Sequence, residues 1–473
     1  MKAFLLFSVM LTITLCATAQ QAAPPALPLT EAGQRVDGYI KAFNSGSLET
    51  MRAFISANVG EDAIKRRSID ERLQIYKEML ANMKSLELNR VMEATPGSIT
   101  GLFHTGNGEW FEIGFMFEPA PPHKLLGLRV EDSDPPSASK SRGASDAPLS
   151  TITEAEFVVA VENRLKELVK ADQFSGTVLI GKNGKPIFEK AYGLASKEHG
   201  VANRIDTKFN LGSINKLFTQ IAIGQLVEQG KLSFDDKLSI HVPDYPNRQD
   251  AQRITVRQLL SMSSGVGDIF GERFDLLAKD KLRTLKDFVP LFANEPLAFE
   301  PGTQQQYSNG GYVLLGIIIE KLSGQSYYDY VRDHIFKVAG MENTDSYESD
   351  AIVPNLASGY TREGNATGPR RNNIHMRPAR GSSAGGGYST VEDLLKLTIA
   401  VAGNKIRVPH FRSQGHDSAE KAGIGMAGGA PGTNALLEFN PATGYTVIVM
   451  SNYDPPSATA PGKEIRSMLA RIK

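Results

Sequence analysis

Apolar residues recur at two different periods in the first part of the chain. From Leu29 to Ser56 they follow helical spacing, with a Gly-containing break near Asn44–Ser47, and a further helix is predicted over Asp70–Met83. Beyond these helices, from Glu87 to Glu131, the pattern becomes strand-like, with runs such as TGLFHT and EWFEIGFMFE separated by Gly and Pro turns. Helices followed by antiparallel strands predict a small α+β domain over residues 28–132.

The stretch that follows breaks this pattern. Residues 133–150 are rich in Ser, Pro, Ala and charge and almost free of large apolar side chains, which is typical of a linker. The next segment opens with a helix that ends near Lys170 and with two strand-like runs around Lys182, Asn183 and Gly184, a strong hairpin signal. At 473 residues the chain is long enough for two cores, so we expect a two-domain α+β protein with the second domain over residues 151–473.

The first 19 residues have the pattern of a secretory signal peptide. An early lysine precedes an apolar run from Phe4 to Leu15, and Ala17 and Ala19 form a small-x-small cleavage signal. We therefore expect cleavage near Ala19 and a periplasmic or secreted protein. No later stretch reaches about 18 apolar residues, so we expect no stable membrane span. The single cysteine, Cys16, lies in this segment, which leaves the predicted mature chain without disulfides or thiolate metal ligands.

Charge and histidine placement argue against two classes of function. Lysine plus arginine and aspartate plus glutamate both total 52, so the formal net charge is zero and nothing favours nucleic acid. The eight histidines are scattered, with no His-x-x-x-His pair and no acidic partner at ligand spacing. We expect no metal and no cofactor.

A serine nucleophile needs a base within hydrogen-bond reach, and Ser-x-x-Lys supplies one on the same helix face. The tetrapeptide occurs three times, at Ser137–Lys140, Ser213–Lys216 and Ser418–Lys421. The first lies in the linker and the third in a polar, Gly-rich stretch. Only Ser213 stands at the start of a predicted amphipathic helix, which closes at Gly230. An ordinary helix N-cap with an exposed lysine nearby is the alternative interpretation.

A second pattern supports the chemical interpretation. Tyr307 and Asn309 form a Tyr-x-Asn just before an apolar helix, where a loop could present both side chains to a cleft. Another Tyr-x-Asn, Tyr245–Asn247, spans Pro246 in a predicted turn.

Five segments in order, FNLGSINKLFT, ITVRQLLSMSSGV, FEPGTQQQYSNGGYVLLGIIIE, GGGYSTVEDLLK and GAPGTNALLEFNP, resemble the serine β-lactamase-related family. That family includes class C β-lactamases, penicillin-binding carboxypeptidases, D-aminopeptidases and esterases. The resemblance implies an antiparallel sheet flanked by helices, with a helical subdomain.

It also implies roles for individual residues. Ser213 resembles the acylated nucleophile, Lys216 the group that accepts its proton, and Tyr307 the acid–base for the leaving group and the deacylating water. Asn309 would bind the acyl side of the substrate, and the backbone N–H groups of Ser213 and Gly429 would form the oxyanion hole. We expect burial to lower the pKa of Lys216 and the lysine charge to lower that of Tyr307.

The chain departs from the family at its third motif, where Lys or His precedes a small residue and Gly. The matching segment here is Met426-Ala427-Gly428, and a thioether can neither pair with a substrate carboxylate nor move a proton. A rival register, Lys421-Ala422-Gly423, keeps the cation but requires a five-residue shift. A second departure is Met262, where the family usually has histidine.

The order of elements in residues 28–132, and the phrase YIKAFNSGSLETMRAF in particular, resembles the cone-shaped α+β barrel of the NTF2 or SnoaL type. Some relatives of that fold carry an acid–base pair. The candidates here, His104, Glu112 and His123, have no distinctive spacing, so we favour binding or scaffolding over catalysis for this domain.

These observations predict an exported serine hydrolase that acts through an acyl-enzyme on Ser213. An ester or a peptide, such as a D-amino peptide, is the expected substrate, and efficient β-lactam hydrolysis is not expected because of Met426. The alternative is a catalytically impaired binding protein for a peptide or cell-wall fragment.

Overall fold

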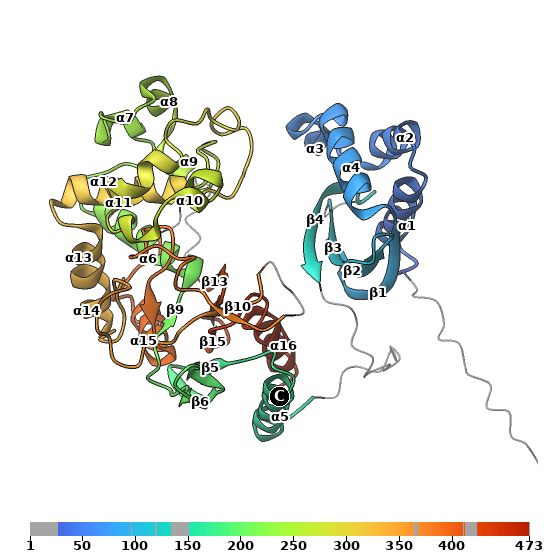
Figure 1. Ribbon diagram of the computed structural model, residues 1–473. Helices are drawn as coiled ribbons and strands as arrows, with labels where there is room; N and C mark the ends of the chain where they lie inside the picture. The colour runs from blue at the N-terminus through green and yellow to red at the C-terminus, as the bar shows by residue number, and fades with distance from the viewer. Residues whose placement is uncertain are drawn as a thin grey trace, which may run out of the picture. The chain divides into compact units, whose positions relative to one another are not determined.

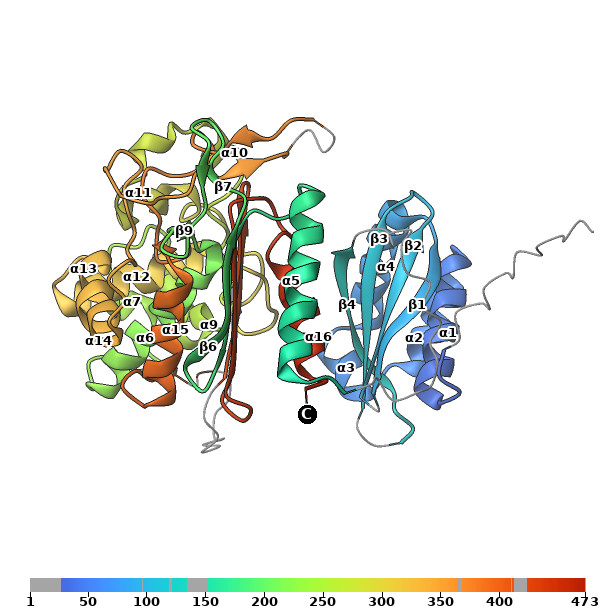
Figure 2. The same cartoon turned by 90° about the horizontal axis from the view of Figure 1, so that it is seen from below.

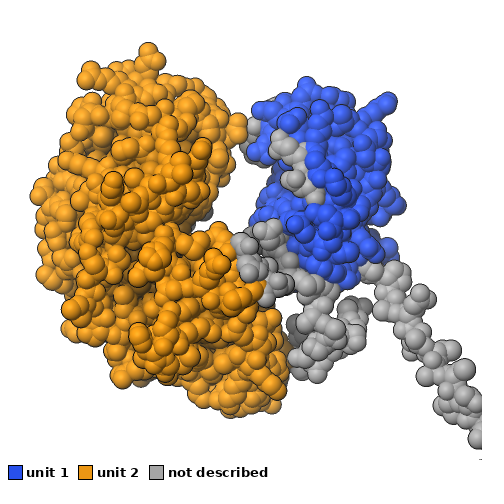
Figure 3. Space-filling view, viewed as in Figure 1, with its two compact units in different colours: residues 1–145 blue, residues 146–473 orange. Residues whose placement is uncertain are grey.

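The computed structural model describes residues 27–95, 97–118, 121–133, 151–363, 368–409, 411 and 423–472. The predicted signal peptide and most of the predicted linker lie outside the described residues. The chain divides into two compact units, residues 1–145 and 146–473 (Figure 3), and the division falls within the segment predicted as a linker. Each unit has a hydrophobic core of its own.

In the first unit, helices precede an antiparallel sheet with the strand order β1-β2-β3-β4 (Figure 1). The predicted break between the first two helices is confirmed, with Gly46 at φ +66°. The described strands form an open meander, so the expected closed, cone-shaped barrel stays a prediction. The elements are α1 (Glu31–Asn44), α2 (Leu48–Asn58), α3 (Glu61–Arg66), α4 (Ile69–Met83), β1 (Leu86–Thr95), β2 (Ser98–Thr105), β3 (Trp110–Phe117) and β4 (Leu125–Ser133).

Aromatic side chains fill the core of the first unit. The Tyr39 ring lies 5.4 Å from that of Phe115 and 5.7 Å from that of Phe54, both in edge-to-face geometry. Phe43 and Phe103 are fully buried beside them. Such rings bury large apolar areas, which is how a unit of this size can hold its helices on one sheet.

The second unit is organised around a five-stranded antiparallel sheet in the order β13-β14-β15-β5-β6. Helices α5 and α16 cover one face and α6 and α15 lie on the other, as the two views show (Figures 1 and 2). Both faces are buried, so successive residues serve different cores: Val178 packs toward α5 and α16, and Leu179 packs into the helical part. The strands are β5 (Gly176–Lys182), β6 (Lys185–Tyr192), β13 (Ile424–Ala430), β14 (Thr433–Asn440) and β15 (Tyr445–Ser451).

The predicted hairpin is confirmed. Strands β5 and β6 pair antiparallel, and Lys182 faces Lys185 across the turn. Asn183 has φ +51° and Gly184 has φ +76°, the left-handed values that a two-residue turn between twisted strands requires.

The remaining elements build the helical part and its connections to the sheet. No described helix is long and apolar enough to span a membrane. The longer helices are α5 (Glu154–Lys170), α6 (Asn215–Glu228), α12 (Asn309–Ser323), α15 (Val391–Ala402) and α16 (Thr459–Leu469). The short ones are α7 (Leu238–His241), α8 (Arg248–Arg253), α9 (Val256–Leu260), α10 (Glu272–Leu276), α11 (Leu285–Phe288), α13 (Tyr327–Val331) and α14 (Lys337–Ala339). Short strands are β7 (Leu194–Ser196), β8 (Val201–Ala202), β9 (Phe209–Asn210), β10 (Tyr360–Thr361), β11 (Arg371–Asn372) and β12 (Tyr388–Ser389).

Candidate active site

Ser213 lies on a tight turn that leads directly into α6. Residues Gly212–Ile214 form one 3₁₀ turn, η1, and Lys216 follows on the first turn of the helix. Gly212 has φ +49°, and a Cβ there would lie 2.8 Å from the backbone nitrogen of Gly429 on β13. Only glycine fits a left-handed position this close to a strand. The turn therefore holds Ser213 against the edge of the sheet.

Helix α6 differs from the prediction in one respect. It is buried on nearly all sides and is not amphipathic, because it lies between the sheet and the other helices. The predicted end is close to the observed one, since the helix stops at Glu228 and Gly230 has φ +67°. A lysine on such a helix is forced into the interior.

The structure brings three of the predicted residues together. The Ser213 Oγ lies 2.5 Å from the Tyr307 hydroxyl and 3.3 Å from the Lys216 Nζ. The Lys216 Nζ also lies 4.7 Å from the centroid of the Tyr307 ring. The serine hydroxyl thus has two titratable partners within hydrogen-bond reach, one on its own helix and one 94 positions away in the sequence.

Lys216 is buried, with 1% of its surface exposed. Besides Ser213, its ammonium donates to the Asn309 Oδ1 at 2.7 Å and to the Ala384 carbonyl at 2.6 Å. Burial lowers the pKa of Lys216 to about 7, and the negative charge of Asp268 opposes that shift. The expectation of a lowered lysine pKa is confirmed, so uncharged lysine is accessible at neutral pH.

Tyr307 behaves differently from the expectation. Loss of water around its hydroxyl raises the pKa of Tyr307, Asp268 adds to the rise, and the hydrogen bond with Ser213 opposes it. The prediction that the lysine charge lowers this pKa was wrong. Loss of water around the phenol outweighs the hydrogen bond with Ser213, which is the influence that lowers the Tyr307 pKa. Tyr307 is therefore a protonated phenol at neutral pH.

Asn309 lies between Lys216 and an acid that the sequence analysis missed. Its Nδ2 donates to both carboxylate oxygens of Asp268 at 3.0 and 2.9 Å, while its Oδ1 accepts from Lys216. The Asn309 backbone N–H, at the start of α12, also donates to Asp268 at 3.0 Å. Both ends of the amide are bonded within the protein, so Asn309 orients the lysine. A lone acidic residue after a Gly-containing loop has no pattern that could have revealed Asp268.

A backbone hydrogen bond fixes the residue that precedes Tyr307. The Gln306 N–H donates to the Met262 carbonyl at 2.9 Å, and Met262 has φ +57°. The other Tyr-x-Asn has structural roles: Tyr245 is buried in the core and the Asn247 side chain caps α8.

Helix α6 also fixes the loop that contains Ala384. The Asn215 Nδ2 donates to the Ser382 carbonyl at 2.8 Å, and the Thr219 hydroxyl donates to the Ser383 carbonyl at 2.7 Å. Lys216 lies between these two residues and bonds the next carbonyl, that of Ala384. Three successive carbonyls of the loop are thus bonded from one face of the helix. This loop could not be predicted from the sequence, because its contribution is made by backbone atoms.

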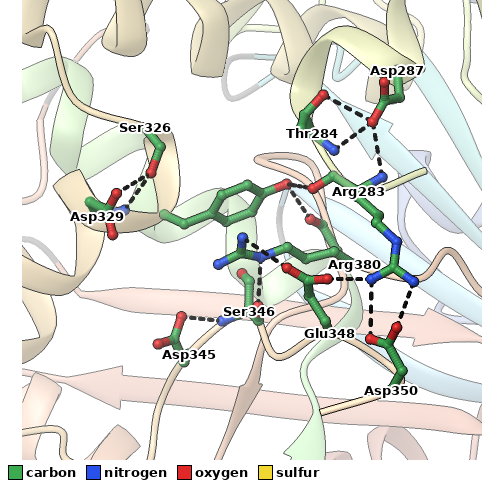
Figure 4. A network of polar contacts seen from close by, with 12 residues as sticks. Arg283, Thr284, Asp287, Ser326, Asp329, Asp345, Ser346, Glu348, Asp350 and Arg380 are labelled. Carbon is green, nitrogen blue, oxygen red and sulfur yellow. Dashed lines mark hydrogen bonds and ion pairs between the residues drawn. The ribbon is translucent and has the colours of Figure 1, made fainter. Parts of the chain in front are cut away.

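A polar network anchors the segment that precedes this loop (Figure 4). Arg283 pairs with Glu348 and Asp350, and Arg380 donates to the Ser346 carbonyl at 2.8 Å. The Arg380 guanidinium lies 3.6 Å from the centroid of the Tyr328 ring. These ion pairs are partly exposed, so each adds little to stability, and their main effect is to fix where the segment lies.

Strand β13 forms the opposite wall. A Cβ at Gly428 would lie 2.0 Å from the Leu211 carbonyl oxygen and 2.8 Å from the Ser213 nitrogen, so only glycine fits. Met426 is two residues earlier on the same face and packs against the hydrophobic core.

In the rival register, Lys421 and Ala422 lie outside the described residues, as do the decoys Ser137–Lys140 and Ser418–Lys421. Gly423 lies beside the Phe439 carbonyl, five residues away from the contact with Ser213.

Two hollows meet at Ser213. One of about 590 Å³ is bordered by Tyr307, Asp268 and the β13 residues Ala427 and Gly428. The other, of about 620 Å³, extends past Tyr388 and Arg377. Ser213, Phe270, Asn309 and Gly429 line both. A substrate bond placed over Ser213 would have room for one group on each side.

Residues 161–470 match the beta-lactamase family. The chain belongs to the beta-lactamase family. The resemblance drawn from the sequence is thereby confirmed for the second unit. The NTF2 or SnoaL assignment of residues 28–132 stays a prediction.

Several relatives in this family are penicillin-binding proteins. The chain is 35% identical over 205 residues to penicillin-binding protein 4* of Bacillus subtilis, covering 42% of this chain and 45% of that protein. It is 28% identical over 351 residues to the putative penicillin-binding protein PbpX of the same organism, covering 71% of this chain and 83% of that one. The chain thus spans less than half the length of the first of these relatives.

Solved structures show the same fold. The penicillin-binding protein of Bacillus halodurans superposes with a TM-score of 0.57 at 30% identity and covers 64% of this chain and 99% of that one. A D-amino acid amidase from Ochrobactrum anthropi superposes with a TM-score of 0.55 at 22% identity, over 67% of this chain and 98% of that one. Among the described residues, no three His, Cys, Asp or Glu side chains gather as metal ligands would.

Proposed function

We propose that the second unit hydrolyses an ester or a peptide, such as a D-amino peptide, through an acyl-enzyme on Ser213. One observation carries the proposal: the Ser213 Oγ lies within hydrogen-bond distance of both the Lys216 Nζ and the Tyr307 hydroxyl. A buried base and a phenol on the same hydroxyl supply the two proton transfers that acyl transfer needs.

In the acylation step, uncharged Lys216 takes the Ser213 proton as the Oγ bonds to the substrate carbonyl carbon. The Tyr307 hydroxyl then donates a proton to the leaving oxygen or nitrogen as its bond to that carbon breaks, and the Lys216 ammonium returns the proton it took from Ser213 to the Tyr307 oxygen. In deacylation, water attacks the acyl carbon, passes its proton to the Lys216–Tyr307 network, and Ser213 leaves with a proton. The lysine pKa of about 7 makes it a base of suitable strength at neutral pH.

The negatively charged substrate oxygen that forms in each step needs hydrogen-bond donors that are already in place. The backbone nitrogens of Ser213 and Gly429 border the contact between η1 and β13, where Gly212 and Gly428 allow close approach. We assign the oxyanion hole to these two N–H groups. Asn309 and Asp268 act as positioning residues for Lys216.

Met426 sets the substrate preference in this proposal. By the resemblance in sequence it stands where the family has its third-motif cation, and its thioether cannot pair with a carboxylate. We therefore expect poor turnover of penicillins, whose carboxylate would have no partner there. Met426→His or Met426→Lys should raise activity on such substrates.

The proposal also includes the location of the protein and the role of its first unit. The signal-like first 19 residues would direct the chain to the periplasm or the medium, where cell-wall peptides are within reach. The NTF2-like or SnoaL-like first unit would then act as a binding or scaffolding domain. The His104 ring lies 4.7 Å from that of Trp110, and the His123 Nδ1 lies 2.9 Å from the Glu118 carbonyl oxygen, so each histidine has a local partner.

The test uses the purified full-length protein with a fluorophosphonate probe and a panel of chromogenic esters, D-amino peptides and a β-lactam. Wild type should label and should hydrolyse at least one ester or peptide, and Ser213→Ala should do neither. Matched thermal melts show whether the variant remains folded. Absence of labelling and of turnover in wild type would overturn the proposal.

A second function is favoured by one observation: a methionine, Met426, stands where the resemblance places the family's third-motif cation. In this alternative the cleft binds a peptide or cell-wall fragment without cleaving it. It predicts saturable binding of muropeptides that Ser213→Ala retains, together with no covalent labelling of wild type.

A further inference from the structure

We propose that the larger hollow beside Ser213 binds an acyl group that has an apolar body and a terminal anionic group, and that Arg377 holds the anionic end. This inference rests on the proposed function and specifies its substrate class. It concerns the hollow of about 620 Å³ that extends from Ser213 past Tyr388.

The walls of this hollow are mainly apolar. Side chains of Ile269, Phe270 and Phe274 come from the α10 region, and Met376, Pro378 and Tyr347 face them. Pockets of about 300–1,000 Å³ with such walls enclose drug-sized organic molecules. The hollow is therefore large enough for an acyl group well beyond acetyl, and its surface favours a hydrocarbon or aromatic body.

The position of Tyr307 indicates which part of the substrate enters this hollow. Tyr307, the proton donor to the leaving group in the proposed mechanism, lines the smaller hollow of about 590 Å³ and not the larger one. The leaving group must lie on the side of its proton donor. The larger hollow then takes the acyl part that stays on Ser213.

Arg377 is the unusual feature of this hollow. Its side chain is partly buried, and its Nη1 donates to the hydroxyl of Tyr388, a neutral partner. Among the described residues no carboxylate pairs with this guanidinium. Cations taken out of water in proteins are normally paired, and a guanidinium with free N–H groups matches a carboxylate in bidentate geometry.

Tyr388 fixes Arg377 relative to the nucleophile. It lies on β12, which pairs with β9 so that Tyr388 faces Asn210, three residues before Ser213. Its backbone also pairs with Asp345 in both directions. A phenol held this firmly keeps the guanidinium at a constant place in the hollow that Ser213 opens into.

The other charged side chains on the wall do not take this role. The Lys279 ammonium donates to the carbonyls of Phe274, Asp275 and Leu277, at 3.2 Å to Asp275 and 2.9 Å to Leu277, so its three N–H groups are engaged. Lys279 adds positive potential without offering a donor. His375 is exposed, and so are the acids Asp275 and Glu363, neither of which pairs with Arg377 in the described structure.

The experiment compares two chromogenic esters of equal length. One is the p-nitrophenyl monoester of hexanedioic acid, which ends in a carboxylate, and the other is the same compound with that carboxylate capped as a methyl ester. Wild type should prefer the anionic ester in kcat/KM by about tenfold or more, as a charge-assisted hydrogen bond provides. Arg377→Gln should reduce that ratio about tenfold, and Arg377→Lys should retain part of it.

Arg371→Gln is the matched control, since Arg371 is an exposed arginine on β11 nearby in sequence and should leave both rates unchanged. A wild type that hydrolyses the capped ester through Ser213 but has no preference for the anionic one would overturn the inference and leave the proposed function standing. An unaltered ratio in folded Arg377→Gln would do the same. If wild type hydrolyses neither these esters nor any other substrate and resembles Ser213→Ala, the proposed function itself fails.

Discussion

The cores of both units are built from aromatic and aliphatic side chains, but the second unit also buries a lysine, Lys216. In the first unit Tyr39 is buried among rings, and its histidines, His104 and His123, stay at the sheet and a turn with local partners. In the second unit Lys216 lies inside helix α6 with every bond directed at a functional neighbour. Burial of the rings stabilises the first unit, whereas burial of the lysine costs stability and gives the second unit a base of lowered pKa.

The largest expected effect removes that lysine. Lys216→Met keeps much of the side-chain volume but takes away the base, so ester turnover should fall by about a thousandfold or more. Steady-state kinetics on the full-length protein measure the loss. Lys231→Met, at an exposed lysine just after α6, is the control and should change nothing. Substantial turnover in Lys216→Met would mean that Tyr307 or water serves as the base.

Next in size is removal of the phenol. Tyr307→Phe should lower kcat by about a hundredfold, because the leaving group loses its proton donor. Esters with a good leaving group, such as p-nitrophenolate, should suffer less than peptides or alkyl esters. Comparison of the two substrate types checks this directly, with Tyr445→Phe on β15 as the control. Equal losses on both types would contradict the assignment of Tyr307 as the acid.

A smaller effect is expected in the pH profile. Lys216 acts as a base only when uncharged, so kcat/KM should rise with pH through about 7 and level off above it. Asp268 favours the charged lysine, so in Asp268→Asn the lysine pKa falls and the acidic limb moves to lower pH. Asp280→Asn, an exposed acid nearby, should leave the limb in place. An acidic limb that stays at the same pH or moves to higher pH in Asp268→Asn would contradict the charge interaction between Asp268 and Lys216.

The smallest effect belongs to the first unit. His104→Gln and His123→Gln should leave ester hydrolysis by the full-length protein unchanged, because these side chains bond only to local partners. Kinetics of both variants with the ester panel provide the check. A loss of activity without loss of thermal stability would show that the first unit takes part in the chemistry.

Local features of the site could be predicted from the sequence, and long-range ones could not. The Asn183-Gly184 turn and the Ser213–Lys216 spacing are local, so their geometry follows from residues a few positions apart. Asp268 and Ala384 are far from Lys216 in the sequence and come near it only when the chain folds. Ala384 acts through a backbone carbonyl, which any residue could supply. The direction of the Tyr307 pKa shift was mispredicted for the same reason, since it depends on how much water the fold removes.

The most direct test of the central claim is to find the acyl group on Ser213. The protein is mixed with a slowly hydrolysed p-nitrophenyl ester, quenched in acid, and digested for peptide mass mapping. We expect a mass increase equal to the acyl group on the peptide that contains Ser213, which forms with the burst of p-nitrophenolate and is absent in Ser213→Ala. Turnover with no adduct on Ser213, or with the adduct on another residue, would contradict it.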